Sequence, residues 1–134
     1  MRKPILLAIL AGGLAACSNP TETRVAAACE VAFVDPPGAR TTYDSIGTLC
    51  SCFAKNTRDN EGSNYLARVE AALAAVGERR AADGTAWPEA YVALETEYKA
   101  AGDETAVEGL GDILTRMSSV QEDLKADDKC NEYH

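Results

Sequence analysis

Apolar residues recur at helical spacing through most of this chain, and this pattern restricts it to an all-α fold. No segment shows the strict alternation of apolar and polar residues that is typical of a half-buried strand. One helical face, with steps of i, i+3, i+4 and i+7, is made by Ile46, Leu49, Cys50 and Phe53. We expect Thr41 or Thr42 to cap this helix, because a hydroxyl at the N-cap accepts a hydrogen bond from the first turn.

Three further apolar stripes follow, separated by turn signals at Asp83-Gly84 and Gly102-Asp103. The first comprises Tyr65, Leu66, Val69, Leu73 and Val76. The second, behind a capping Thr85, comprises Trp87, Tyr91, Leu94 and Tyr98. The third comprises Val107, Leu110, Leu114, Met117 and Leu124. The sequence therefore predicts a small up-and-down bundle of about four helices, with the aromatic residues and Met117 in its core or at its rim.

A short additional helix over residues 25–33 is expected before these four. Its alanine content favours a helix, and the consecutive prolines of Asp35-Pro36-Pro37-Gly38 end it. In the last helix, Gly109 and Gly111 either allow a neighbouring helix to approach closely or weaken the first turns. The sequence leaves both interpretations open.

The N-terminal segment is divided as a secretory signal is. Arg2 and Lys3 make a basic start, residues 5–10 are apolar, and small residues follow. It ends in Leu14, Ala15, Ala16 and Cys17. This ending resembles the bacterial lipobox, whose cysteine receives a diacylglyceryl group before cleavage on its N-terminal side. The resemblance implies a signal peptide over residues 1–16 and a lipid on Cys17. Residues 18–24 are polar and contain Pro20, so the sequence predicts a lipid anchor and tether over residues 17–24 and a helical domain over residues 25–134.

The same resemblance implies a location in the cell envelope. Two or more acyl chains on Cys17 give stable attachment to a membrane, because each buried methylene contributes about 0.8 kcal/mol. In enteric-type sorting an aspartate after the lipidated cysteine favours the inner membrane, but residue 18 is a serine. We therefore expect the chain to be lipid-anchored in the periplasmic leaflet of the outer membrane.

Five cysteines become an even set once Cys17 is assigned to lipid. The remaining four are Cys29, Cys50, Cys52 and Cys130. An even number in an exported chain predicts two disulfides, and a Cys50–Cys52 bridge is discounted because helix geometry does not allow that ring. We favour Cys29–Cys50 with Cys52–Cys130, and the exchanged pairing remains open. A different hypothesis makes Cys50 and Cys52 a soft-metal or thiol-exchange site, with Met117 or His134 as a further ligand.

Charge limits the classes of partner. Removing Arg2 and Lys3 with the signal leaves 11 of the 13 basic residues against 21 acidic ones, a net charge of about −10. Nucleic acid is excluded, because it requires a basic patch. If the chain has a protein partner, this charge favours a basic one, and solubility alone also accounts for the charge. The one histidine is the terminal His134, so we expect neither a catalytic site nor a bound cofactor or metal ion. A non-enzymatic interaction or envelope-accessory module is the function predicted.

Overall fold

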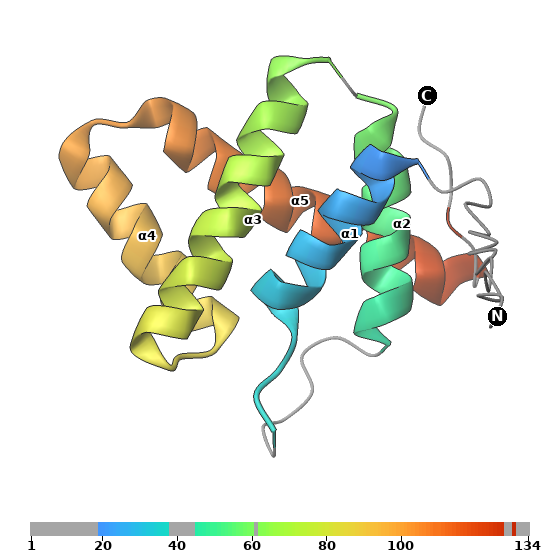
Figure 1. The fold of residues 1–134 in the computed structure, drawn as a ribbon, viewed down its shortest axis with the longest axis horizontal. Helices are drawn as coiled ribbons and strands as arrows, with labels where there is room; N and C mark the ends of the chain where they lie inside the picture. Colours follow the sequence, from blue (N-terminus) through green and yellow to red (C-terminus); the bar gives the residue numbers. More distant parts are fainter. Residues whose placement is uncertain (1–18, 38–44, 61, 128–129, 131–134) are drawn as a thin grey trace, which may run out of the picture.

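The computed structural model describes residues 19–37, 45–60, 62–127 and 130, which form five α-helices and no strand. The helices are α1 (Pro20–Phe33), α2 (Ile46–Arg58), α3 (Asn64–Asp83), α4 (Trp87–Ala101) and α5 (Glu104–Asp127) (Figure 1). The all-α prediction is confirmed, and the short N-terminal helix is a full member of the bundle.

Helix α1 begins at Pro20, five residues before the expected start at residue 25. The Asn19 side chain accepts hydrogen bonds from the backbone N–H groups of Thr21 and Glu22, and Pro20 occupies the first turn, where a missing N–H costs nothing. Asparagine and proline are also common in loops, which is why the sequence predicts a tether there. Residues 20–24 are instead helical and leave a much shorter connection to Cys17.

Two other predicted caps differ from the structure. Ser45 stands at the N-cap of α2, and the expected Thr41 and Thr42 lie outside the described residues. Ala86 stands at the N-cap of α4, and the Thr85 hydroxyl is buried without a hydrogen-bond partner in the described part of the chain. Helix α4 therefore starts without the side-chain cap that the sequence predicts.

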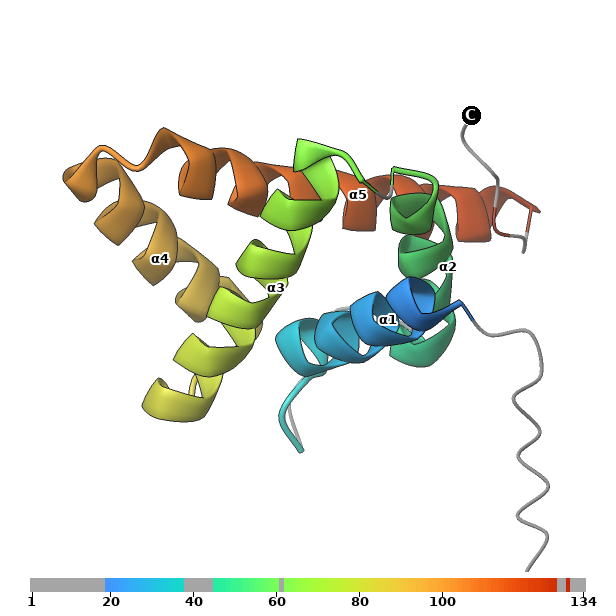
Figure 2. The ribbon, with the colours of Figure 1, turned by 45° about the horizontal axis from the view of Figure 1, so that its top comes forward.

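The helices do not follow one another up and down along a common axis. Helix α5 crosses behind α3, α1 and α2 in Figure 1, and it lies across the top of the molecule in Figure 2. Helix α5 packs against α2, α3 and α4, while α1 packs against α2 and α3. The 24 residues of α5 give this helix a length of about 36 Å, long enough to bridge both ends of the bundle. The predicted up-and-down order is therefore replaced by a crossing helix.

The stripe predicted for α5 is displaced in the structure. The buried apolar side chains of this helix are Leu110, Ile113, Met117 and Val120. Val107, Leu114 and Leu124 are only half-buried, and neither Ile113 nor Val120 was predicted. The four buried residues are themselves spaced by three, four and three positions, so the sequence contains this stripe beside the predicted one. The close-approach interpretation holds for Gly109, where a Cβ would lie 2.9 Å from the backbone oxygen of Arg68 in α3, whereas Gly111 has open space around it.

Candidate functional site

The four cysteines other than Cys17 lie in two disulfides around α2. Cys29–Cys50 joins α1 to α2 with a Cα–Cα distance of 5.6 Å. Cys52–Cys130 joins α2 to the chain beyond α5 with a Cα–Cα distance of 5.4 Å. The favoured pairing is the one in the structure, and the exchanged pairing is not.

The bridges lie in the apolar interior. Cys29, Cys50 and Cys52 are fully buried, and the Sδ atom of Met117 lies 3.9 Å from the Sγ atom of Cys29. A Cu(I) site at Cys50 and Cys52 requires two thiolates, so both bridges must be reduced before such a site can form. Across the described residues, no group of three or more His, Cys, Asp or Glu side chains is placed to hold a metal ion. His134, weighed as a further ligand, lies outside those residues.

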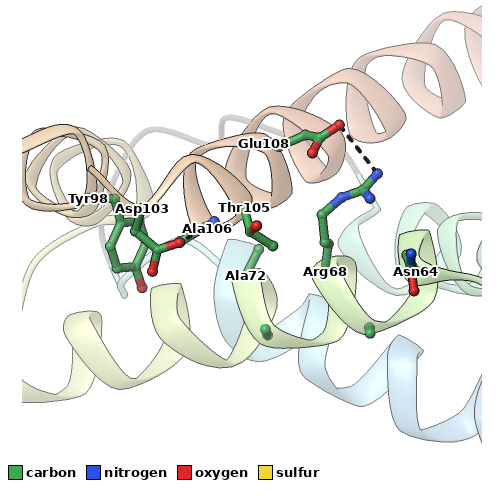
Figure 3. Close-up of a pocket in the computed structure, with 10 residues that line it drawn as sticks. Asn64, Arg68, Ala72, Tyr98, Asp103, Thr105, Ala106 and Glu108 are labelled. Carbon is green, nitrogen blue, oxygen red and sulfur yellow. Dashed lines mark hydrogen bonds and ion pairs between the residues drawn. The ribbon is translucent and has the colours of Figure 1, made fainter. Parts of the chain in front are cut away.

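A pocket of about 470 Å³ opens where α3, α4 and α5 meet (Figure 3). Its wall combines small and polar side chains: Asn64, Ala67, Arg68, Ala71, Ala72, Tyr98, Asp103, Thr105, Ala106 and Glu108. Alanines on α3 make the hollow, because their short side chains leave space between the crossing helices. The sequence offers no signal for this pocket, since it depends on the crossing angle of α5 rather than on any motif.

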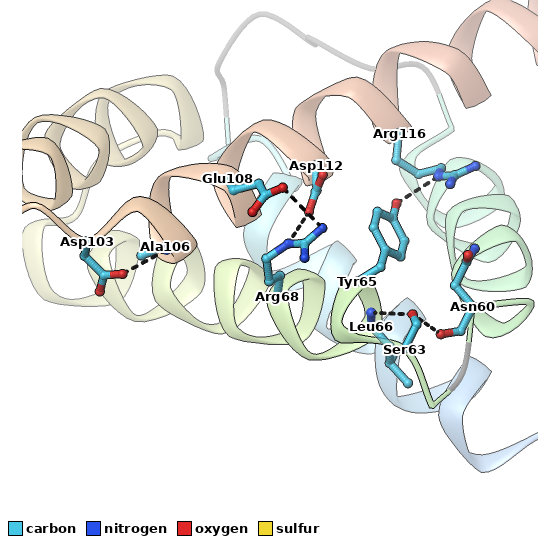
Figure 4. Close-up of polar contacts among 10 residues, drawn as sticks. All are labelled: Asn60, Ser63, Tyr65, Leu66, Arg68, Asp103, Ala106, Glu108, Asp112 and Arg116. Atoms are coloured by element: carbon cyan, nitrogen blue, oxygen red, sulfur yellow. Dashed lines mark hydrogen bonds and ion pairs between the residues drawn. The ribbon is translucent and has the colours of Figure 1, made fainter.

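Ionisable groups at the pocket wall are held in structural contacts (Figure 4). The Nε atom of Arg68 donates a hydrogen bond of 2.9 Å to Asp112, and its guanidinium lies 3.7 Å from Glu108. The bond to Asp112 is the main cause that raises the pKa of Arg68 above its ordinary value. Asp103 accepts a hydrogen bond of 3.0 Å from the Ala106 N–H and so caps α5.

A second polar contact continues the α3–α5 interface beside the pocket. Arg116 donates a hydrogen bond of 3.0 Å to the Tyr65 hydroxyl, and its guanidinium carbon lies 5.5 Å from the centre of the Tyr65 ring (Figure 4). Together with Arg68 and Asp112, this pair fixes how α5 crosses α3. Arg68, Asp112 and Arg116 therefore serve the packing of α3 against α5.

Two further findings bear on function. None of the described helices is both long and apolar enough to cross a bilayer. Comparison with protein-family models, with curated proteins and with solved structures found no match. Cys17, the predicted lipidation site, lies outside the described residues.

Proposed function

We propose that this chain is a lipid-anchored helical module of the bacterial cell envelope that acts by binding a partner and not by catalysis. The observation that carries the proposal is the pairing of Cys29 with Cys50 and of Cys52 with Cys130. It uses four of the five cysteines and leaves Cys17, which closes the lipobox-like Leu14-Ala15-Ala16-Cys17. An exported chain with two structural disulfides and one odd cysteine at that position fits a lipoprotein.

The proposed location is the periplasmic leaflet of the outer membrane. Disulfides persist in an oxidising compartment, which supports export from the cytoplasm. Acyl chains on Cys17 supply the membrane attachment, and two or more chains are needed to make it stable. Ser18 supports the outer membrane over the inner one by the sorting preference already described.

A basic protein is the proposed partner, because negative charge is concentrated in the second half of the domain. Residues 64–127 carry 13 acidic and 6 basic side chains, whereas residues 19–60 carry 5 acidic and 4 basic ones. An acidic surface attracts a basic partner and raises its rate of association, most strongly at low ionic strength.

Cell fractionation tests the anchor. Cys17→Ala should move the protein from the membrane fraction to the soluble periplasm and abolish incorporation of labelled palmitate. Ser18→Ala, which keeps the modified cysteine, is the matched control and should stay in the membrane fraction. Unchanged membrane retention of Cys17→Ala would refute the anchor.

A further inference from the structure

We infer that the bundle is held directly against the lipid headgroups by the end that carries the start of α1 and the end of α2. This anchored end consists of Asn19, Glu22, Thr23, Arg58 and Asp59. The inference rests on the proposed lipidation of Cys17 and adds a defined orientation to it. The partner of this surface is the headgroup layer of the membrane.

Chain length supplies the first argument. Asn19 follows Cys17 by two residues, and two extended residues span at most about 7 Å. The Asn19 side chain accepts a hydrogen bond of 2.9 Å from the Thr21 N–H, so the helix starts immediately after this short connection. A lipidated Cys17 at the membrane surface therefore brings the first turn of α1 to the headgroups and leaves little freedom for the domain to move away.

Contacts within the bundle define what else lies at this end. Arg58, the last residue of α2, donates a hydrogen bond of 2.8 Å to Glu22, three residues after Asn19. Asp59 caps α2 and is exposed. Helix α4 packs on α3 and α5, and both Figure 1 and Figure 2 place it at the other end of the molecule from α2. The end of α2 should therefore lie nearer to the bilayer than α4 does.

The distribution of charge supports the same orientation. Residues 19–60 have a net charge of −1, from 5 acidic and 4 basic side chains, and residues 64–127 have a net charge of −7, from 13 and 6. An anionic lipid surface repels the second half more strongly than the first. Most of the negative charge of the second half lies at the α4 end of the molecule, because residues 87–108 carry 6 acidic side chains and 1 basic one (Figure 1). Electrostatics and tether length therefore favour the same orientation.

Photocrosslinking from two exposed positions tests the orientation. Asp59→benzoylphenylalanine reports on the anchored end, and Val92→benzoylphenylalanine reports on α4, where Val92 is 59% exposed. The full lipidated chain is reconstituted into vesicles of phosphatidylethanolamine and phosphatidylglycerol, and the protein–lipid adduct is measured after irradiation. The adduct should be several-fold more abundant from position 59 than from position 92. Equal yields, or a larger yield from position 92, would overturn the inference.

Lengthening the connection between Cys17 and α1 is an independent test of the same inference. A Gly/Ser insertion of about ten residues between Ser18 and Asn19 has a root-mean-square span of about 17 Å. It should lower the adduct from position 59 severalfold while the protein still floats with the vesicles. An adduct that the insertion leaves unchanged would also overturn the inference. Absence of lipid on Cys17, or loss of vesicle binding by the native chain, would refute the proposed function itself.

Discussion

The molecule has a bridged region, α1 and α2, and an unbridged region, α3 and α4, with α5 packed against α2, α3 and α4. Both disulfides attach to α2, whereas the chain contains no cysteine between Cys52 and Cys130. In the unbridged region the helices depend on apolar packing and polar contacts, and α4 buries only Ala90 and Leu94 completely. The comparison teaches that covalent stability is concentrated in the two helices that follow the proposed anchor, and that the acidic, pocket-bearing region is held by weaker forces.

Removing a bridge should have the largest effect on stability. In the chain-entropy model, a separation of 78 residues corresponds to about 4.5 kcal/mol and a separation of 21 residues to about 3.3 kcal/mol. Cys52→Ala/Cys130→Ala should therefore lower the free energy of unfolding in urea more than Cys29→Ala/Cys50→Ala. Replacing both members of a pair leaves no free thiol to react. A reversed order would contradict the dependence on loop length, and losses under about 1 kcal/mol for both variants would show that the bridges do not distinguish the two regions.

A glycine pair tests how closely α5 approaches the unbridged region. Gly109→Ala places a Cβ 2.9 Å from the Arg68 carbonyl oxygen, so the helices must separate, at a cost of about 1–3 kcal/mol. Gly111→Ala meets no atom within 4 Å and should stabilise the protein by up to about 1 kcal/mol through helix propensity. Urea unfolding of the two variants measures the difference. Equal effects would contradict the close contact between α3 and α5.

Arg80 connects the two regions and should have an intermediate effect. Its guanidinium donates hydrogen bonds to the carbonyl oxygens of Val31 (3.0 Å), Ala32 (2.8 Å) and Val34 at the end of α1. Arg80→Ala should lower the free energy of unfolding by about 1–2 kcal/mol, because the group is partly exposed and its bonds are screened. Arg79→Ala is the control, since Arg79 contacts Glu97 and Asp83 within the unbridged region, and its effect should be smaller. A larger loss of unfolding free energy for Arg79→Ala would show that Arg80 is not the main contact between the bridged and unbridged regions.

Tyr91 should give the smallest effect, seen only at alkaline pH. Burial raises the pKa of its phenol above the ordinary value of 10.0. The folded state therefore binds this proton more tightly than the unfolded state does, so stability is retained below about pH 10 and falls as the pH rises through the folded pKa. Tyr91→Phe should reduce this decline and leave stability at neutral pH almost unchanged. An alkaline decline of the same size in the variant would assign the loss to other groups.

The sequence predicts the bridged region better than the crossing of the helices. The apolar spacing of Leu49, Cys50 and Phe53 identifies the buried face of α2, and the cysteine count predicts two bridges but leaves two pairings open, since both are local or numerical signals. The buried face of α5 is predicted only in part, because two apolar stripes at helical spacing run along this helix and share Leu110 and Met117. The spacing alone does not say which stripe faces the other helices. The pocket was missed for the same reason, since it arises where three helices meet.

The central claim is that four cysteines are structural and that the fifth carries the lipid. Peptide mass mapping of the mature protein, purified from membranes without reduction, tests it most directly. The account predicts disulfide-linked peptides joining Cys29 to Cys50 and Cys52 to Cys130, no free thiol, and an N-terminal peptide that begins at acylated Cys17. An unmodified Cys17, or free thiols at Cys50 and Cys52 in the native protein, would contradict it.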